Sequence, residues 1–174
     1  VTVDLATGTA TDSFGNTDTI SGFEVVRGTQ FTDSFIGGAA DETFRGMGGN
    51  DNINGGGGSN WVSYSADVFA LQENQVLGAV TVDLGAGTAT DSYGGTDTLT
   101  NIQNAAGGTL GDALTGSAGD NIFRGFSGND AINGLGGSDT VDYSRDEESG
   151  RVTFLNGSGA VVVNLTAGTP TDGF

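Results

Sequence analysis

The chain has 174 residues, with 22 acidic residues against five arginines, no lysine, no histidine and no cysteine, and a net charge of −17. This balance excludes nucleic acid and anionic membrane surfaces as natural partners, because both are bound by clusters of Lys and Arg. Without Cys and His, only oxygen ligands remain for a metal, and these suit Ca²⁺, Mg²⁺ or Mn²⁺. A cation is therefore the partner that the composition favours.

The composition also argues against catalysis. The chain lacks the commonest general base and the thiol nucleophile, and no isolated carboxylate pair of the glycosidase kind is evident. We therefore predict no catalytic residues and no enzyme activity. The sequence shows no apolar run near transmembrane length, so we expect no membrane insertion. No signal peptide is visible either, and a fragment that has lost its export signal would have the same appearance.

A long repeat organises the chain. Residues 3–20 recur, with few changes, at 82–99, and a third copy begins at Val163. A period of this kind is typical of solenoids and arrays. It predicts a first module over residues 1–79, a second over 80–160 and the start of a third over 161–174.

A nine-residue repeat lies inside each module. Its units begin at Gly28, Gly37, Gly46 and Gly55, and again at Gly107, Gly116, Gly125 and Gly134. Position six is acidic or an amide, as Asp33, Glu42, Asp51, Asn60, Asp112, Asn121, Asp130 and Asp139. Position eight is always large and apolar, as Phe35, Phe44, Ile53, Val62, Leu114, Phe123, Ile132 and Val141.

Each unit predicts a turn followed by a very short strand. The first six residues are Gly-rich and polar, as in turns with unusual backbone angles. The last three alternate polar, apolar, polar, which places one side chain inward. Two units make a coil of eighteen residues, and stacked coils give two parallel sheets with the position-eight residues between them. Such a thin core cannot by itself offset the ordering entropy of so many glycines.

A metal can supply the missing stability. Position-six residues should stack every eighteen residues, so that Asp33 faces Asp51, Asp112 faces Asp130, and Asn121 faces Asp139. Turn carbonyls beside them would give the six to eight oxygens that Ca²⁺ accepts. We therefore predict calcium ligands at all eight position-six residues, with Glu42 and Asn60 as the poorest pair and Asp41 and Asp120 as substitutes. Asp18 and Asp97 lie outside the register, and turn capping and ligation are equally open for them.

The repeat resembles a known family. Residues 125–142 fit the pattern G-G-x-G-x-D-x-(large apolar)-x of the hemolysin-type RTX calcium repeat, except that Phe126 and Leu135 replace the second glycine. The resemblance covers residues 15–65 and 94–144. It implies an all-β, right-handed parallel β-roll with Ca²⁺ between its turns, in blocks at about 28–65 and 107–144. It also implies type I export, and hence a secreted or cell-surface protein.

The segments between the rolls predict β-hairpins. Residues 151–165 flank an Asn-Gly turn, and residues 79–84 should be the corresponding strand of the second module. A helix over 68–76 is the one weak helical candidate.

Two functions remain open. The modular period favours a calcium-stiffened structural array of adhesin, surface-layer or fibre type, which folds on calcium after export and can self-associate or stack end to end. The alternative is the non-catalytic C-terminal RTX domain of a secreted protease, lipase or epimerase.

Overall fold

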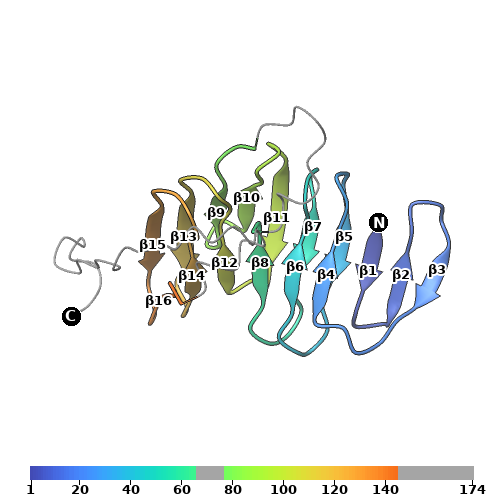
Figure 1. The fold of residues 1–174 in the computed structure, drawn as a ribbon. Coiled ribbons are helices and arrows are strands. Elements are labelled where there is room, and N and C mark those ends of the chain that lie inside the picture. The colour runs from blue at the N-terminus through green and yellow to red at the C-terminus, as the bar shows by residue number, and fades with distance from the viewer. Residues whose placement is uncertain (66–76, 145–174) are drawn as a thin grey trace.

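The computed structural model describes residues 1–65 and 77–144 (Figure 1). In these residues the chain forms strands and no helix, so no helix there could cross a membrane. The strands of the first module are β1 (Thr2–Asp4), β2 (Thr9–Thr11), β3 (Thr17–Thr19), β4 (Val25–Arg27), β5 (Ser34–Ile36), β6 (Thr43–Arg45), β7 (Asn52–Asn54) and β8 (Trp61–Ser63). Those of the second are β9 (Thr81–Asp83), β10 (Thr88–Thr90), β11 (Thr96–Thr100), β12 (Asn104–Ala106), β13 (Ala113–Ser117), β14 (Ile122–Arg124), β15 (Ala131–Leu135) and β16 (Thr140–Val141).

The strands form two facing sheets (Figure 1). Sheet A has the order β15-β13-β9-β10-β11-β7-β5-β1-β2-β3, and sheet B has the order β16-β14-β12-β8-β6-β4. All pairs in sheet B are parallel. Successive strands along each block alternate between the sheets, because each nonapeptide supplies one strand and the chain then turns to the other side. The predicted parallel β-roll is confirmed.

The core is one side chain thick, as the period requires. Position-eight residues pair in register across each sheet, Phe35 with Ile53 in sheet A and Phe44 with Val62 in sheet B. Six of the eight are at most 1% exposed, namely Phe35, Phe44, Ile53, Val62, Leu114 and Phe123. Ile132 is partly buried, and Val141, on the last described strand, is 41% exposed. The core therefore thins toward β15 and β16.

The stretch between the blocks departs from the expected single strand. Strand β9 is present at the predicted place, but β10 and β11 follow it in an antiparallel meander. This meander is built into sheet A, where β11 pairs in parallel with β7 and β9 pairs in parallel with β13. In sheet B, β8 pairs directly with β12, so the two blocks form one continuous roll. Strands β1, β2 and β3 form the same meander in the first module.

The predicted hairpin over 151–165, the weak helix over 68–76 and the start of a third module lie outside the described residues.

Candidate calcium sites

Each position-six side chain folds back over the glycine that opens its own unit. A β-carbon on Gly46 would lie 2.0 Å from Asp51 Oδ2, and one on Gly125 would lie 2.1 Å from Asp130 Oδ2. The other units place the position-six side chain against the opening glycine in the same way, at Gly28, Gly37, Gly55, Gly107, Gly116 and Gly134. Position one is therefore glycine because a larger residue would displace the position-six side chain.

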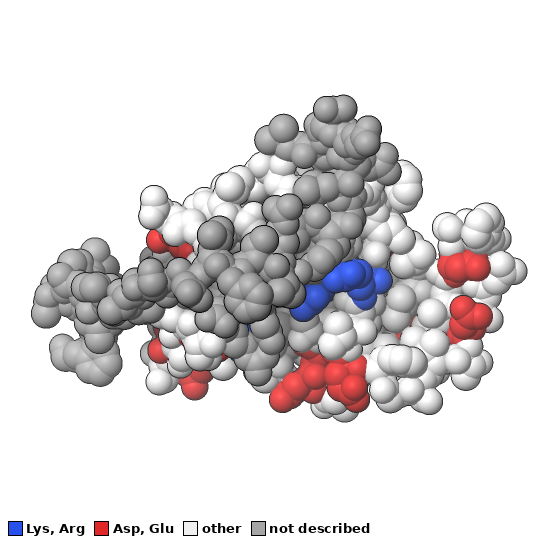
Figure 2. Space-filling view, viewed as in Figure 1, with Lys and Arg blue, Asp and Glu red and all other residues white. Residues whose placement is uncertain are grey.

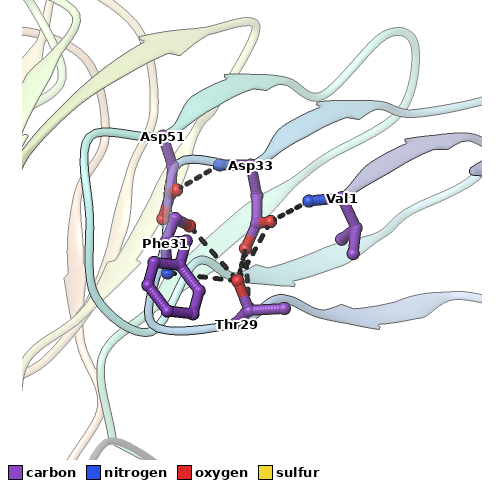
Figure 3. Close-up of polar contacts among 5 residues, drawn as sticks. All are labelled: Val1, Thr29, Phe31, Asp33 and Asp51. Atoms are coloured by element: carbon purple, nitrogen blue, oxygen red, sulfur yellow. Dashed lines mark hydrogen bonds and ion pairs between the residues drawn. The ribbon is translucent and has the colours of Figure 1, made fainter. Parts of the chain in front are cut away.

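The position-six residues form hydrogen-bonded columns. The backbone N–H of Asp33 donates to Asp51 Oδ1 at 2.8 Å (Figure 3). The same bond, eighteen residues apart, joins Asp112 to Asp130, Glu42 to Asn60 and Asn121 to Asp139, each at 2.9 Å. The predicted eighteen-residue stacking is confirmed for these pairs.

There are two such columns, one beside each sheet. The acidic edge lies at the beginnings of the sheet A strands and consists of Asp33, Asp51, Asp97, Asp112 and Asp130. The amide edge lies at the beginnings of the sheet B strands and consists of Glu42, Asn60, Gln103, Asn121 and Asp139.

Two members of these columns, Asp97 and Gln103, lie outside the predicted nine-residue register. The backbone N–H of Asp51 donates to Asp97 Oδ1 at 2.9 Å, although the two residues are 46 apart. The backbone N–H of Asn60 likewise donates to Gln103 Oε1 at 2.8 Å. The meander adds residues between the blocks, so a strict nine-residue count loses the register. The sequence feature that marks Asp97 as a position-six residue is the triplet Asp97-Thr98-Leu99. Leu99 pairs with Ile53, as a position-eight residue would.

The turns along the columns are of two kinds. In the first coil of each block the position-six side chain accepts the position-two N–H, as from Thr29 to Asp33 Oδ2 and from Gly108 to Asp112 Oδ2, both at 2.6 Å. We call these capped turns. In the second coil position two is left-handed, with φ values of 78° at Met47, 64° at Phe126 and 67° at Leu135. These open turns explain the second glycine of the repeat pattern, since side chains rarely tolerate that region.

The stacked turns leave buried carboxylate oxygens without donors. In the described residues Asp51 Oδ2, Glu42 Oε2 and Asp91 Oδ2 are buried and have no hydrogen-bond partner. Burial raises the pKa of Asp51 to about 7, and the carboxylates of Asp97, Asp33 and Asp91 add to the rise. Burial also raises the pKa of Asp97 to about 6. Ionised groups in such positions need a cation, because a buried unpaired charge is costly.

The three arginines of the described residues lie on sheet B. Arg27, Arg45 and Arg124 follow the inner residues of sheet B strands. Figure 2 shows basic side chains together near the centre of this face, with acidic side chains below them and at the sides. Arg124 lies over the Trp61 ring, 4.3 Å from its centroid, and pairs with Asp142 at 3.0 Å.

In the first module the Val1 nitrogen donates to Asp33 Oδ1 on the acidic edge (Figure 3). The second module makes the same contact with a neutral donor, since the Val80 N–H donates to Asp112 Oδ1 at 2.8 Å. Most of the charge on this edge is therefore left for a cation from outside the chain.

These sites fit Ca²⁺. No three acidic side chains of the described residues lie close enough to hold a metal by themselves, so backbone carbonyls must supply part of any coordination shell. The turns bring carbonyls of neighbouring coils into contact: a β-carbon on Gly49 would lie 2.9 Å from the Phe31 carbonyl oxygen, and one on Gly128 would lie 2.4 Å from that of Leu110. Mixed carboxylate and carbonyl oxygens in a flexible loop suit Ca²⁺ better than the strict octahedron of Mg²⁺.

Residues 36–67 and 106–141 match the family model of the RTX calcium-binding nonapeptide repeat. The chain carries RTX repeats. The resemblance read from residues 125–142 is thereby confirmed, and the matched segments contain both open-turn coils. No curated protein matches the chain. RTX repeats bind Ca²⁺ and occur in type I secreted proteins, so these two matched segments form a calcium-binding repeat region of that kind.

Proposed function

We propose that Ca²⁺ is bound between stacked capped and open turns, with the acidic edge providing the stronger sites. The ligands there are Asp33, Asp51, Asp112 and Asp130, together with turn carbonyls. The amide edge provides weaker sites through Asp139, Asn121, Glu42 and Asn60. The unpartnered Asp51 Oδ2 carries this ranking, since the side-chain amides of Asn60 and Asn121 already donate to carbonyls of the protein.

This RTX segment serves, we further propose, as a calcium-stiffened spacer in a secreted or cell-surface protein of adhesin, surface-layer or fibre type. The supporting observation is the junction between the modules, where β7 pairs with β11 and β8 pairs with β12. A meander followed by a roll block can repeat indefinitely by this junction. Strands β3 and β4, the counterparts of β11 and β12, end the two sheets on the side of the first module.

Calcium couples this architecture to export. In a calcium-poor cell, repulsion between the carboxylates would keep the roll unfolded, and the millimolar calcium outside the cell would fold it. Extracellular calcium modules typically have Kd values of about 10⁻⁴ to 10⁻³ M.

The test is small-angle scattering and sedimentation of the chain with and without millimolar calcium, followed by electron microscopy of the parent protein. We expect a rod in calcium, and end-to-end assemblies or long module arrays in the parent. A parent that is a dispersed monomer, with a catalytic domain beside only these modules, would instead assign the segment to a secreted protease, lipase or epimerase.

A further inference from the structure

The junction between the modules contains a buried carboxylate outside the nonapeptides. Asp91 lies directly after β10, at the start of the loop that leads to β11, and is 1% exposed. Its Oδ1 accepts the N–H groups of Tyr93 and Gly95, at 2.7 and 2.8 Å. Its Oδ2 has no hydrogen-bond partner of ordinary geometry, although the Gly49 N–H lies close enough to the carboxylate to lower its pKa. The residue therefore shapes its loop with one oxygen and leaves the other available.

The loop that Asp91 shapes stacks directly on the last acidic-edge turn of the first module. The Thr96 N–H donates to Asn50 Oδ1 at 2.8 Å, and the Tyr93 ring lies 3.0 Å from where a β-carbon of Gly48 would be. A β-carbon on Gly95 would lie 1.9 Å from the Gly49 carbonyl oxygen and 2.6 Å from Asp91 Oδ2. Asp91 Oδ2 of the second module and the Gly49 carbonyl oxygen of the first module thus both lie beside the place that a side chain on Gly95 would occupy.

The first module shows what happens when this arrangement is absent. Asp12 and Asn16 are the counterparts of Asp91 and Gly95. Asn16 carries a side chain, and its Nδ2 donates to Asp12 Oδ2 at 3.1 Å. Asp12 is thus satisfied by its own loop, whereas Gly95 has no side chain to offer Asp91. The second module lacks this donor at the place where a carbonyl from the first module enters.

We propose that a Ca²⁺ ion binds at this junction, between Asp91 Oδ2 and the Gly49 carbonyl oxygen, and ties the second module to the first. The site differs from the nonapeptide sites because Asp91 precedes position one of any unit in its module and lies outside the matched repeats. Asp51 and Asp97 add negative charge close by, since each interacts electrostatically with Asp91. Burial also raises the pKa of Asp91, while the N–H groups of Gly95, Tyr93, Gly94 and Gly49 oppose the rise.

The test compares Asp91→Asn with Asp12→Asn. The amide introduced by Asp91→Asn would keep the oxygen that accepts from Tyr93 and Gly95, so the loop keeps its shape, and only the second oxygen is replaced. Bound calcium is counted by native mass spectrometry, and urea unfolding midpoints are measured over a calcium series. We expect Asp91→Asn to bind one ion fewer per chain, with a correspondingly shallower dependence of the midpoint on calcium. Asp12→Asn should bind as many ions as wild type, and any shift of its midpoint from the lost Asn16 contact should be the same at every calcium concentration.

The two measurements separate a metal site from a purely structural role. At the lowest calcium the amide of the Asp91→Asn variant can donate to the Gly49 carbonyl, so this variant should be at least as stable as wild type there and less stable at high calcium. An unchanged ion count would overturn the proposal. So would a midpoint displaced equally at every calcium concentration, because that pattern reports a loop contact and no ion. If Asp91→Asn fails to fold at low calcium, Asp91→Ser repeats the midpoint series with the same two outcomes.

Discussion

The acidic and amide edges share a backbone arrangement and differ in what satisfies their side chains. On both edges position-six residues accept the N–H of a neighbour one coil away. On the amide edge Asn60 Nδ2 donates to the carbonyls of Gly57 and Asn101, and Asn121 Nδ2 donates to that of Gln103. On the acidic edge Asp51 Oδ2 finds no donor. On the amide edge the one such oxygen among the described residues is Glu42 Oε2. One RTX scaffold thus has an edge closed by protein hydrogen bonds except at Glu42 and an edge that needs a cation.

The residue at position six determines whether the turn is stabilised by hydrogen bonds within the protein or by a bound metal ion. An amide at position six brings its own donor, so it stabilises the roll with or without calcium. A carboxylate at the same place repels its neighbours until an ion arrives, and then contributes the ion's binding free energy. The dependence of the free energy of unfolding on calcium should therefore come mainly from the carboxylates of the acidic edge.

The largest expected effect is that of calcium removal. Millimolar calcium is about one to ten times the Kd of such sites, so each site contributes about 0.4 to 1.4 kcal/mol. Loss of several sites therefore removes a large part of the roughly 5 to 15 kcal/mol margin of a typical domain. We expect the far-ultraviolet circular dichroism of the chain to lose its β signal in chelator and regain it in millimolar calcium. Unchanged β signal and melting temperature in chelator would show that the acidic edge is satisfied without a metal.

A charge exchange between the edges should have the next largest effect. Asp51→Asn keeps the oxygen that accepts from Asp33 and removes the unpartnered one. We expect it to weaken calcium binding about tenfold or more, equivalent to about 1.4 kcal/mol, and to stabilise the calcium-free chain under mildly alkaline conditions. Calorimetric calcium titration and urea unfolding measure the two effects.

The reciprocal variant is Asn60→Asp, which turns a donor into a carboxylate facing two carbonyls. An unsatisfied buried group costs about 1 to 3 kcal/mol, so this variant should be destabilised in chelator and partly recovered by calcium. Equal losses for both variants at every calcium concentration would contradict the distinction between the edges.

The acidic edge should also respond to pH in the opposite direction from an ordinary ion pair. The pKa of Asp51 is raised from 3.8 to about 7, and that of Asp97 to about 6, so the folded chain binds more protons than the unfolded chain between about pH 4 and pH 7. Folding free energy is therefore lost as the pH rises through this window. In calcium-free buffer we expect higher urea midpoints at about pH 5 than at about pH 8.

Calcium should reverse this pH dependence, because protons compete with the ion for the same carboxylates. Asp51→Asn provides the control and should flatten the calcium-free profile. A calcium-free midpoint that rises across the same pH interval would show that these carboxylates are stabilised when ionised.

The roll could be predicted from sequence because its information is local. The spacing of Asp130 and Ile132 repeats in every unit, so fold, stacking and candidate ligands all follow from one nonapeptide. The meander could not be predicted in this way, because β9, β10 and β11 belong to sheet A only through pairing with strands of other segments. Asp97 and Asp91 were missed as column and junction residues for the same reason. Their roles depend on residues more than forty positions away, such as Asp51 for Asp97, which no local spacing reveals.

The smallest expected effect concerns the backbone of the open turns. Leu135 adopts a φ of 67° and is 47% exposed, so its side chain adds little packing. The left-handed conformation costs a non-glycine residue about 1 to 2 kcal/mol in the folded chain. Glycine avoids this cost, but its greater freedom in the unfolded chain lowers the free energy of unfolding by about 0.4 to 1 kcal/mol. Leu135→Gly should therefore stabilise the calcium-bound chain by about 0.6 to 1 kcal/mol, the difference between these two effects, measured by urea unfolding.

This amide-edge position is the clean probe of that strain. On the acidic edge the equivalent residues Met47 and Phe126 are buried, at 4% and 9% exposure, so glycine there would also remove core contacts. Leu110 is the matched control, since it is 44% exposed in a capped turn and has no positive φ. Leu110→Gly should destabilise by about 0.4 to 1 kcal/mol through the unfolded chain alone. If both variants destabilise equally, the open turn carries no strain at Leu135, and the second glycine of the repeat pattern needs another explanation.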